Sequence, residues 1–181
     1  KTYSLLTQLT IAVGFSIAFT VFFNVEDLLF AWTSNLDLVS IGSSTLQVYV
    51  LASGLMLIMI PQYFLQVGHG KLRLHVYGSV IHLIVMLPAL YFAAIDYGAV
   101  GCGICWIIFR LIFLFLWTPI IHNKFLPGAH LRWLIHDVGK LVCILFLLGF
   151  GLERLWSLIY YDSKLFIILK LMISTVISFF V

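Results

Sequence analysis

The sequence predicts an all-α integral membrane protein with about six transmembrane helices. Of its 181 residues, 63% are hydrophobic and only 9% are charged, whereas a soluble domain has roughly 45–50% apolar and about 25% charged residues. The apolar residues form continuous runs of about 20 residues, the length that crosses the hydrocarbon core as a helix. They do not alternate as in the strands of a membrane barrel. A soluble globular protein is excluded, because a core of this size could not hide so much apolar surface.

Six apolar runs are expected to form the spanning helices. The first four are long, the fifth is short and the sixth ends with the chain. They cover about residues 4–24, 45–67, 74–95, 98–121, 138–156 and 164–181. Because the chain begins with Lys1 and stops inside an apolar run, we expect it to be the C-terminal part of a longer membrane protein.

The connections between the runs differ in charge. The second connection contains Lys71 and Arg73, and the fourth contains Lys124, Arg132 and Lys140. The first and third connections contain acidic residues but no Lys or Arg. Cytoplasmic connections carry the excess of Lys and Arg, so the second and fourth are expected inside, together with the first residue of a multi-pass protein.

The fourth connection, residues 122–140, is expected to be a cytoplasmic interfacial segment. Its stretch "HLRWLIHDVGK" places apolar residues on one helical face and basic residues on another, with Trp133 between them. This pattern is typical of a short helix that lies in the membrane interface. An ordinary basic loop that leads into the fifth helix would also account for it.

Two basic residues lie inside apolar runs. Arg110 is near the middle of the fourth run, where an arginine costs about 2.5–3.5 kcal/mol to insert. Trp106, one turn earlier, can make a cation–π contact with it. We expect Arg110 to line a hydrated cavity, although extension of its side chain to the interface is the alternative. Lys170 lies closer to the start of its run, and its side chain is expected to extend to the outer interface.

Polar residues form stripes on two adjoining helices. Gln62, Gln66, His69 and Arg73 follow one face at the end of the second run. His75, Ser79 and His82 follow one face at the start of the third. A shared polar cavity that opens to the cytoplasm is one interpretation, and hydrogen bonding between helices without a ligand is the other.

The sequence contains no recognisable catalytic motif, so the protein is not expected to be an enzyme. Cys102 and Cys105 have the spacing of a metal or redox pair, but no second pair completes a site. Their glycine-rich surroundings favour close helix packing. No cofactor, metal site or nucleic-acid partner is expected.

An ordered series of features resembles a known family. It comprises Pro61-Gln62-Tyr63 with Gln66, Gly68-His69-Gly70 before a basic turn, Pro88, Tyr97–Gly101 leading to Trp106, His122 with Leu126-Pro127-Gly128, and Arg132-Trp133. Over about residues 1–140 the chain resembles the second half of polysaccharide flippases. These are the O-antigen and capsule oligosaccharide-lipid exporters of the multidrug/oligosaccharidyl-lipid/polysaccharide superfamily, whose fold has two lobes and 12–14 helices.

This resemblance implies a division of the chain and a function. Residues 1–121 would be the last four helices of the second lobe, 122–140 a cytoplasmic interfacial loop, and 141–181 two additional transmembrane helices, the second one truncated. The protein would move undecaprenyl-diphosphate-linked oligosaccharide across the bacterial inner membrane by alternating access, for lipopolysaccharide or other surface polysaccharide. Its partners would be that substrate, membrane lipids and the remaining N-terminal part of the same transporter.

Within this function, Arg110 is expected to bind the diphosphate, and Gln62, Gln66 and His82 the sugar. Two alternatives stay open. A cation-coupled multidrug exporter of the same superfamily would require an intramembrane Asp or Glu. A membrane-embedded enzyme that modifies glycans would require an acid/base pair, for which His130, His136 and Asp137 are the candidates.

Overall fold

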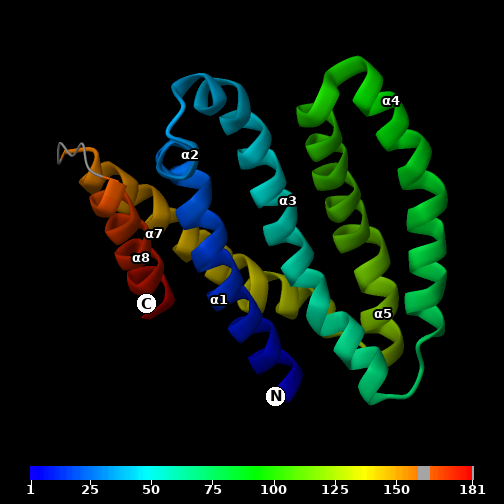
Figure 1. Cartoon of the computed structure of the whole chain (residues 1–181). Coiled ribbons are helices and arrows are strands. Elements are labelled where there is room, and N and C mark those ends of the chain that lie inside the picture. Colours follow the sequence, from blue (N-terminus) through cyan, green and yellow to red (C-terminus); the bar gives the residue numbers. More distant parts are fainter. Residues whose placement is uncertain (159–163, 181) are drawn as a thin grey trace.

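The computed structural model describes residues 1–158 and 164–180, and the regular elements in these ranges are all helices (Figure 1). They are α1 (Thr2–Phe23), α2 (Val25–Thr33), α3 (Leu36–Gly68), α4 (Arg73–Ile112), the π-helical η1 (Phe113–Trp117), α5 (Thr118–Phe125), α6 (His130–Arg132), the π-helical η2 (Trp133–Gly139), α7 (Lys140–Trp156) and α8 (Lys164–Phe180). Several of these elements join end to end without a loop.

Four helical stretches among the described residues are long and apolar enough to cross a membrane. They are Thr2–Phe23, Leu36–Gly68, Arg73–Phe125 and His130–Trp156. A shorter apolar helix covers Phe166–Phe179. Large apolar side chains are exposed on many outer faces, as expected where the surrounding solvent is hydrocarbon. In the part of the chain that the structure describes, an all-helical fold with several helices able to span a membrane is therefore confirmed, while the count of about six spans stays a prediction.

The third of these stretches reverses direction at Gly98. This residue has φ 62° and ψ −149°, a conformation that is open to glycine and costly for residues with a Cβ. Figure 1 shows the chain of α4 turning back at this point to form a hairpin. We call residues 73–97 the first arm and residues 99–125 the second arm. They correspond to the separate third and fourth runs of the sequence.

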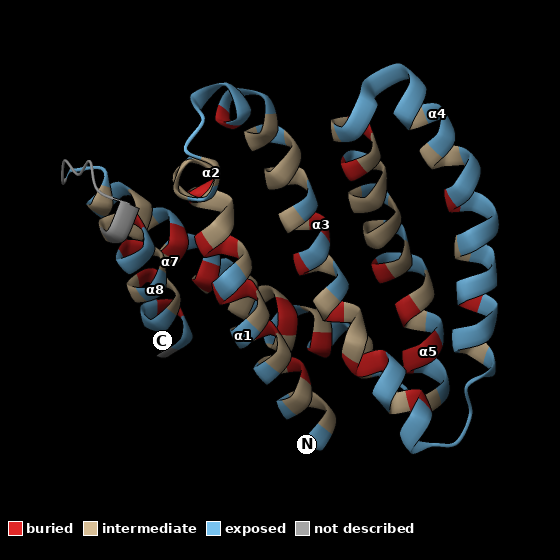
Figure 2. Ribbon diagram, viewed as in Figure 1, coloured by how far each residue is buried: buried red, intermediate tan, exposed pale blue. Residues whose placement is uncertain are grey.

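The buried core lies where α1 packs against α3 and α7. One apolar cluster joins these helices to the second arm and η2; it contains Ile11, Phe15, Phe19, Ile58, Leu114, Trp133, Val138 and Leu145. Figure 2 shows buried residues concentrated on α1, α3 and the segments that they contact, whereas the first arm of α4 is largely exposed. The first arm contacts α3 near their shared turn, where the rings of Tyr63 and His75 have centroids 4.8 Å apart.

The two basic connections lie at one end of the molecule. The turn between α3 and α4 is at the same end as the N-terminus, opposite the Gly98 turn (Figure 1). His69, in that turn, stacks on Phe125 at the end of α5 with ring centroids 4.9 Å apart. Tyr3 is hydrogen-bonded to His122 of α5. This clustering agrees with the charge alternation of the sequence, while the side of the membrane stays a prediction.

Helix α3 begins at Leu36, earlier than the expected start near residue 45. The side-chain oxygen of Asn35 accepts hydrogen bonds from the backbone N–H groups of Asp37 (2.9 Å) and Leu38 (3.3 Å). Asn is among the preferred N-cap residues, and an acidic residue in the first turn favours the helix further. The local capping signal therefore extends the helix beyond its apolar run.

The segment 122–140 is not a loop, because it is helical on both sides of a short turn over residues 126–129. A helical start at His130 is confirmed, but α6 and η2 continue directly into α7 instead of forming a separate helix. Trp133 is 2% exposed and packs in the core, while Leu131 and Ile135 are exposed. Trp133 also donates from Nε1 to Thr7 Oγ1 at 3.0 Å. Packing against α1 therefore decides which face of this segment is buried.

Candidate functional site

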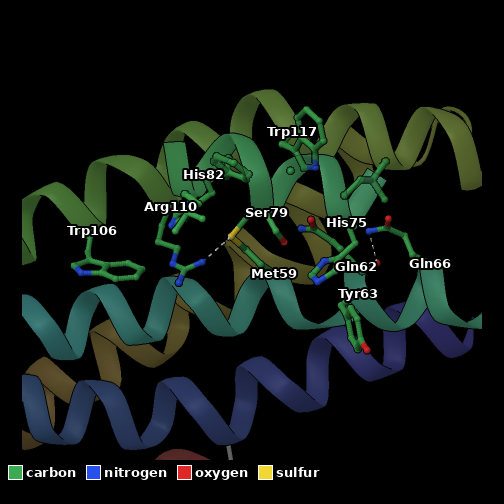
Figure 3. Close-up of a pocket in the computed structure, with 14 residues that line it drawn as sticks. Met59, Gln62, Tyr63, Gln66, His75, Ser79, His82, Trp106, Arg110 and Trp117 are labelled. Carbon is green, nitrogen blue, oxygen red and sulfur yellow. Dashed lines mark hydrogen bonds between the residues drawn. The ribbon is translucent and has the colours of Figure 1, made fainter. Parts of the chain in front are cut away.

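A partly open pocket of about 350 Å³ lies between α3 and the two arms of the hairpin. All four residues that the sequence proposed as a binding site, Arg110, Gln62, Gln66 and His82, line it (Figure 3). The other lining residues are Met59, Tyr63, His75, Gly78, Ser79, Leu83, Trp106, Phe113, Trp117 and Ile121. The fold thus brings together residues from three separate segments of the chain.

Helical periodicity explains why the two polar stripes meet. Gln62 and Gln66 are one turn apart on α3, and His75, Ser79 and His82 recur on one face of the first arm. Residues at these spacings share a face of a helix. The stripes face one pocket because α3 and the first arm are joined by a short turn. His69 and Arg73, which belong to the same stripe as the glutamines, do not line the pocket.

A glycine permits the close approach of the two arms at the pocket wall. A Cβ placed on Gly78 would lie 2.6 Å from Nε1 of Trp117, far inside van der Waals contact. The indole ring of Trp117 therefore occupies space that any larger residue at position 78 would fill. Sequence analysis did not identify Trp117 as a site residue, although an aromatic residue that faces a glycine across a hairpin is a signal of such packing.

The π-helical segment η1 lies in the second arm beside the pocket. It covers Phe113–Trp117, and the hydroxyl of Thr118 donates to the carbonyl of Phe113 at 3.2 Å. A π-helical turn shifts the side chains that follow it, and such turns are frequent at functional sites. Arg110, Phe113 and Trp117 line the pocket at the spacings of three and four that share one helical face. Thr118 faces α3, where its hydroxyl lies 3.0 Å from Gln62 Oε1.

Arg110 lines the pocket, as the cavity interpretation predicted. Its guanidinium carbon is 5.1 Å from the ring centroid of Trp106, so the expected cation–π contact is confirmed. Its Nη1 atom lies 3.9 Å from Met59 Sδ. Within residues 1–158 and 164–180, the ion pairs are those of Arg154 with Glu153 and of Lys170 with Asp27. Arg110 therefore brings a positive charge to the pocket without a carboxylate partner in the described structure.

Gln62 and Gln66 are the most deeply buried polar residues of the pocket, at 3% and 1% exposed. The hydroxyl of Thr118 has one hydrogen and two acceptors within reach, Gln62 Oε1 at 3.0 Å and the carbonyl of Phe113 at 3.2 Å. Gln66 Nε2 donates to the backbone carbonyl of Gln62 at 3.3 Å. The opposite end of each amide, Gln62 Nε2 and Gln66 Oε1, has no partner in the described structure. Buried polar atoms without a hydrogen-bond partner are rare in proteins, so each one requires a physical explanation.

His82 lies among aromatic rings beside Arg110. Its ring centroid is 5.8 Å from that of Trp106, 5.7 Å from that of Phe109 and 5.1 Å from that of Phe113. The pocket therefore combines a cationic and aromatic end with an end that carries two amides (Figure 3). This arrangement can bind an anion at one end and polar or ring-shaped groups along its length.

A second polar cluster, which sequence analysis did not find, joins the start of α1 to residues 122–137. Tyr3, Ser4 and Gln8 all bond to that segment: Tyr3 to His122 at 2.7 Å, and Ser4 and Gln8 to Asp137 Oδ1 at 2.7 and 2.8 Å. Nδ1 of His122 lies 3.0 Å from Nδ1 of His130. The α1 residues lie more than 110 residues away from their partners in the sequence. No local sequence pattern therefore indicates these contacts.

The side chain of Lys170 was expected to extend to the outer interface, and it does reach Asp27 of the first connection, but it is buried there and not exposed. Its side chain is 4% exposed, and its Nζ atom lies 2.5 Å from Asp27 Oδ2 of α2. The ammonium group is thus inside the protein and bound to a carboxylate, instead of extending through lipid. An ion pair between distant segments offsets the cost of burying the charge.

Cys102 and Cys105 are free thiols, and Cys102 Sγ lies 3.8 Å from the carbonyl of Leu90. In the described ranges, no group of three or more His, Cys, Asp and Glu residues is placed to hold a metal ion. A Cβ on the neighbouring Gly103 would lie 2.6 Å from Val48 Cγ1. The small residue at position 103 is therefore explained by the close packing of the second arm on α3.

Comparison of the chain with protein-family models, curated proteins and solved structures gave no match. The function is therefore argued from the site and from the sequence.

Proposed function

We propose that this protein translocates undecaprenyl-diphosphate-linked oligosaccharide across the bacterial inner membrane for surface polysaccharide synthesis. The observation that carries the proposal is the pocket between α3 and the α4 hairpin, with Arg110 facing it. In this proposal the diphosphate binds at Arg110 while the sugars contact the glutamines and aromatic residues. The polyprenyl tail stays in the hydrocarbon outside the protein.

Electrostatics supports this role for Arg110. A diphosphate that leaves water must be compensated by positive or hydrogen-bond-donating groups, and Coulomb attraction is stronger at low dielectric. Arginine matches phosphate with a planar set of donors. Its guanidinium is held by Trp106 and Met59, and no carboxylate in the described structure neutralises it. An anionic substrate group is therefore a fitting partner for it.

The size and lining of the pocket support a glycan as the other part of the substrate. About 350 Å³ is within the range of small-ligand sites and accommodates one or two sugar rings at a time. Gln62, Gln66, Ser79 and His75 offer hydrogen-bonding groups, and Trp117 offers an aromatic face. Passage would follow from the two lobes of the transporter opening alternately to each side, the general behaviour of such carriers.

Two observations bear on the alternatives. None of the described residues that line the pocket is Asp or Glu, so this pocket lacks the carboxylate that a cation-coupled drug exporter would use. Asp137, the candidate acid or base of a glycan-modifying enzyme, accepts two hydrogen bonds from α1. These bonds give Asp137 a structural role, which favours the transport proposal.

The test is substitution of Arg110 in the chromosomal gene, with surface glycan and protein level as readouts. Arg110→Ala is expected to reduce glycan export about tenfold or more, because one charge-assisted contact is lost, and Arg110→Lys is expected to retain part of it. The control is Arg154→Ala, because Arg154 also lies 5.1 Å from an aromatic ring, that of Phe150, but outside the pocket. Normal export with Arg110→Ala at unchanged protein level would contradict the proposal.

A further inference from the structure

One end of the pocket holds Arg110 and His82 side by side. The guanidinium carbon of Arg110 lies 5.1 Å from the ring centroid of Trp106, and the imidazole centroid of His82 lies 5.8 Å from that same centroid. Figure 3 shows the two side chains close to each other in the pocket lining. The second arm of α4 thus contributes a permanent cation, and the first arm contributes a ring that can gain a proton.

Few other groups around the pocket can carry charge. Among the described residues that line it, Arg110 has the one permanent charge, and Tyr63, His75 and His82 are the side chains that can gain or lose a proton. A tyrosine is ordinarily neutral near pH 7. His75 lies two turns before His82, about 10 Å along the helix axis, and its ring stacks on Tyr63. His82 is therefore the titratable lining group at the Arg110 end.

A diphosphate carries more negative charge than Arg110 alone can balance. When it is esterified at both ends, as in the proposed substrate, each phosphate keeps one ionised oxygen, so the group has two negative charges. The rings of Trp106, Phe109 and Phe113 pack around His82 and make the surroundings largely apolar. An unbalanced charge is costly in such surroundings, where Coulomb interactions are strong. Arg110 offsets one of the two charges, and the other requires a second cation.

We propose that His82 takes up a proton when the diphosphate binds and forms a two-cation site with Arg110, an inference that rests on the proposed function. The proton comes from the solvent and adds to the free ring nitrogen of the neutral imidazole. In the empty pocket the charge of Arg110 opposes a second positive charge beside it, and the two negative charges of the ligand reverse this effect. The diphosphate and the two side chains then have no net charge together.

The experiment compares two probes that differ by one negative charge, farnesyl diphosphate linked to glucose and farnesyl monophosphate linked to glucose. Binding to the purified whole protein in lipid nanodiscs is measured by isothermal titration calorimetry in buffers of different ionisation enthalpy, which gives the number of protons taken up. Near pH 7 the diphosphate probe is expected to take up about one proton. The monophosphate probe is expected to take up none, because Arg110 balances its single charge.

The affinity should depend on pH in the same sense. The bound state holds one more proton than the free state, so a rise in pH favours the free state. The affinity for the diphosphate probe is therefore expected to fall between about pH 6 and pH 8, by at most about tenfold per pH unit. The affinity for the monophosphate probe is expected to stay constant over this range.

Substitutions assign the proton to His82. His82→Gln keeps a hydrogen-bonding side chain that cannot gain a proton, so it is expected to abolish the uptake and to weaken binding of the diphosphate probe about tenfold near pH 6. Unchanged binding of the monophosphate probe shows that this variant is folded. His82→Lys supplies a permanent charge and is expected to restore tight binding without proton uptake.

Two further histidines serve for comparison. His75→Gln changes the other histidine of the pocket and is expected to retain the proton uptake, whatever its effect on affinity. His136→Gln is the control outside the pocket, because His136 is exposed and does not line it. That variant is expected to match the unsubstituted protein with both probes.

The outcomes separate this inference from the proposed function. Binding of the diphosphate probe without proton uptake, or equal uptake with both probes, would overturn the role of His82 and leave the transport proposal standing. Proton uptake that persists in His82→Gln would refute the assignment to this residue. Binding of neither probe would overturn the proposed function itself.

Discussion

The hydroxyl of Tyr3 lies 2.7 Å from Nε2 of His122, which joins the first turn of α1 to α5 across 119 residues of sequence. His122 is fully buried, and its other ring nitrogen lies 3.0 Å from Nδ1 of His130. The start of α1 therefore holds the two helices that flank the turn at 126–129. This cluster is at the end of the molecule where the basic connections meet.

Removal of the Tyr3 hydroxyl is expected to weaken this junction. Tyr3→Phe leaves a buried His122 nitrogen without its partner, so the free energy of unfolding should fall by about 1–2 kcal/mol. Thermal denaturation in detergent measures the change. Tyr91→Phe, at an exposed tyrosine of the first arm, serves as the matched control. A melting temperature that falls equally in both variants would show that the Tyr3–His122 bond contributes nothing specific.

The Lys170–Asp27 pair is expected to behave as a coupled unit. Asp27→Asn leaves the ammonium group of Lys170 buried beside a neutral partner, and the free energy of unfolding should fall by about 1–3 kcal/mol. Lys170→Met replaces the buried charge with an apolar chain of similar length and should cost less. The double variant should recover most of the loss. Additive effects of the two substitutions would contradict direct coupling.

Gly103 is expected to be essential for the packing of the second arm on α3. A Cβ at this position would lie 2.6 Å from Val48 Cγ1, so Gly103→Ala should destabilise the protein by about 1–3 kcal/mol through overpacking. Gly151→Ala on α7 is the control, because a Cβ there meets no atom within 4 Å. That substitution should stabilise the helix by about 0.5–1 kcal/mol. The melting temperatures of the two variants, measured by thermal denaturation, test this prediction. A higher melting temperature for Gly103→Ala than for the unsubstituted protein would contradict the close contact with Val48.

Much of the pocket was predictable because it depends on local periodicity. Gln62 and Gln66 on one helix and Ser79 and His82 on the next share faces at helical spacing, and a short turn forces those faces together. Arg110 was predictable from the cost of an unpaired charge in an apolar helix. The reversal of the chain near Gly98 was also predicted from the sequence, because the apolar runs on either side of it were expected to form separate helices.

The remaining features depend on packing between distant segments. Thr118 directly follows a π-helical segment, which no pattern in the apolar run indicates. Trp117, in contrast, continues the helical face of Arg110 and could have been assigned to the pocket from its spacing. Lys170 is bound to Asp27, 143 residues away, and its depth in one helix could not indicate that the side chain would be buried against this partner. Trp133 was assigned to an interface because its contact with Thr7 of α1 cannot be inferred from neighbouring residues.

The placement of the basic connections at one end leads to a prediction about membrane topology. In a variant whose cysteines at 102, 105 and 143 are replaced by alanine, single cysteines are introduced by Asp37→Cys, Lys71→Cys and Lys124→Cys, all at exposed positions. Because Lys and Arg are retained on the cytoplasmic side, a membrane-impermeant maleimide should label only position 37 in intact cells.

Permeabilised cells provide the control for this experiment, since all three cysteines should then react. Labelling of positions 71 and 124 but not 37 in intact cells would invert the orientation and leave the arrangement of the helices unchanged. Labelling of position 71 but not 124 would place the two connections on opposite sides of the membrane. This would conflict with the structure, because His69 and Phe125 stack beside these two positions. The two connections cannot lie on opposite sides of a membrane while that contact exists, so this result would contradict the fold itself.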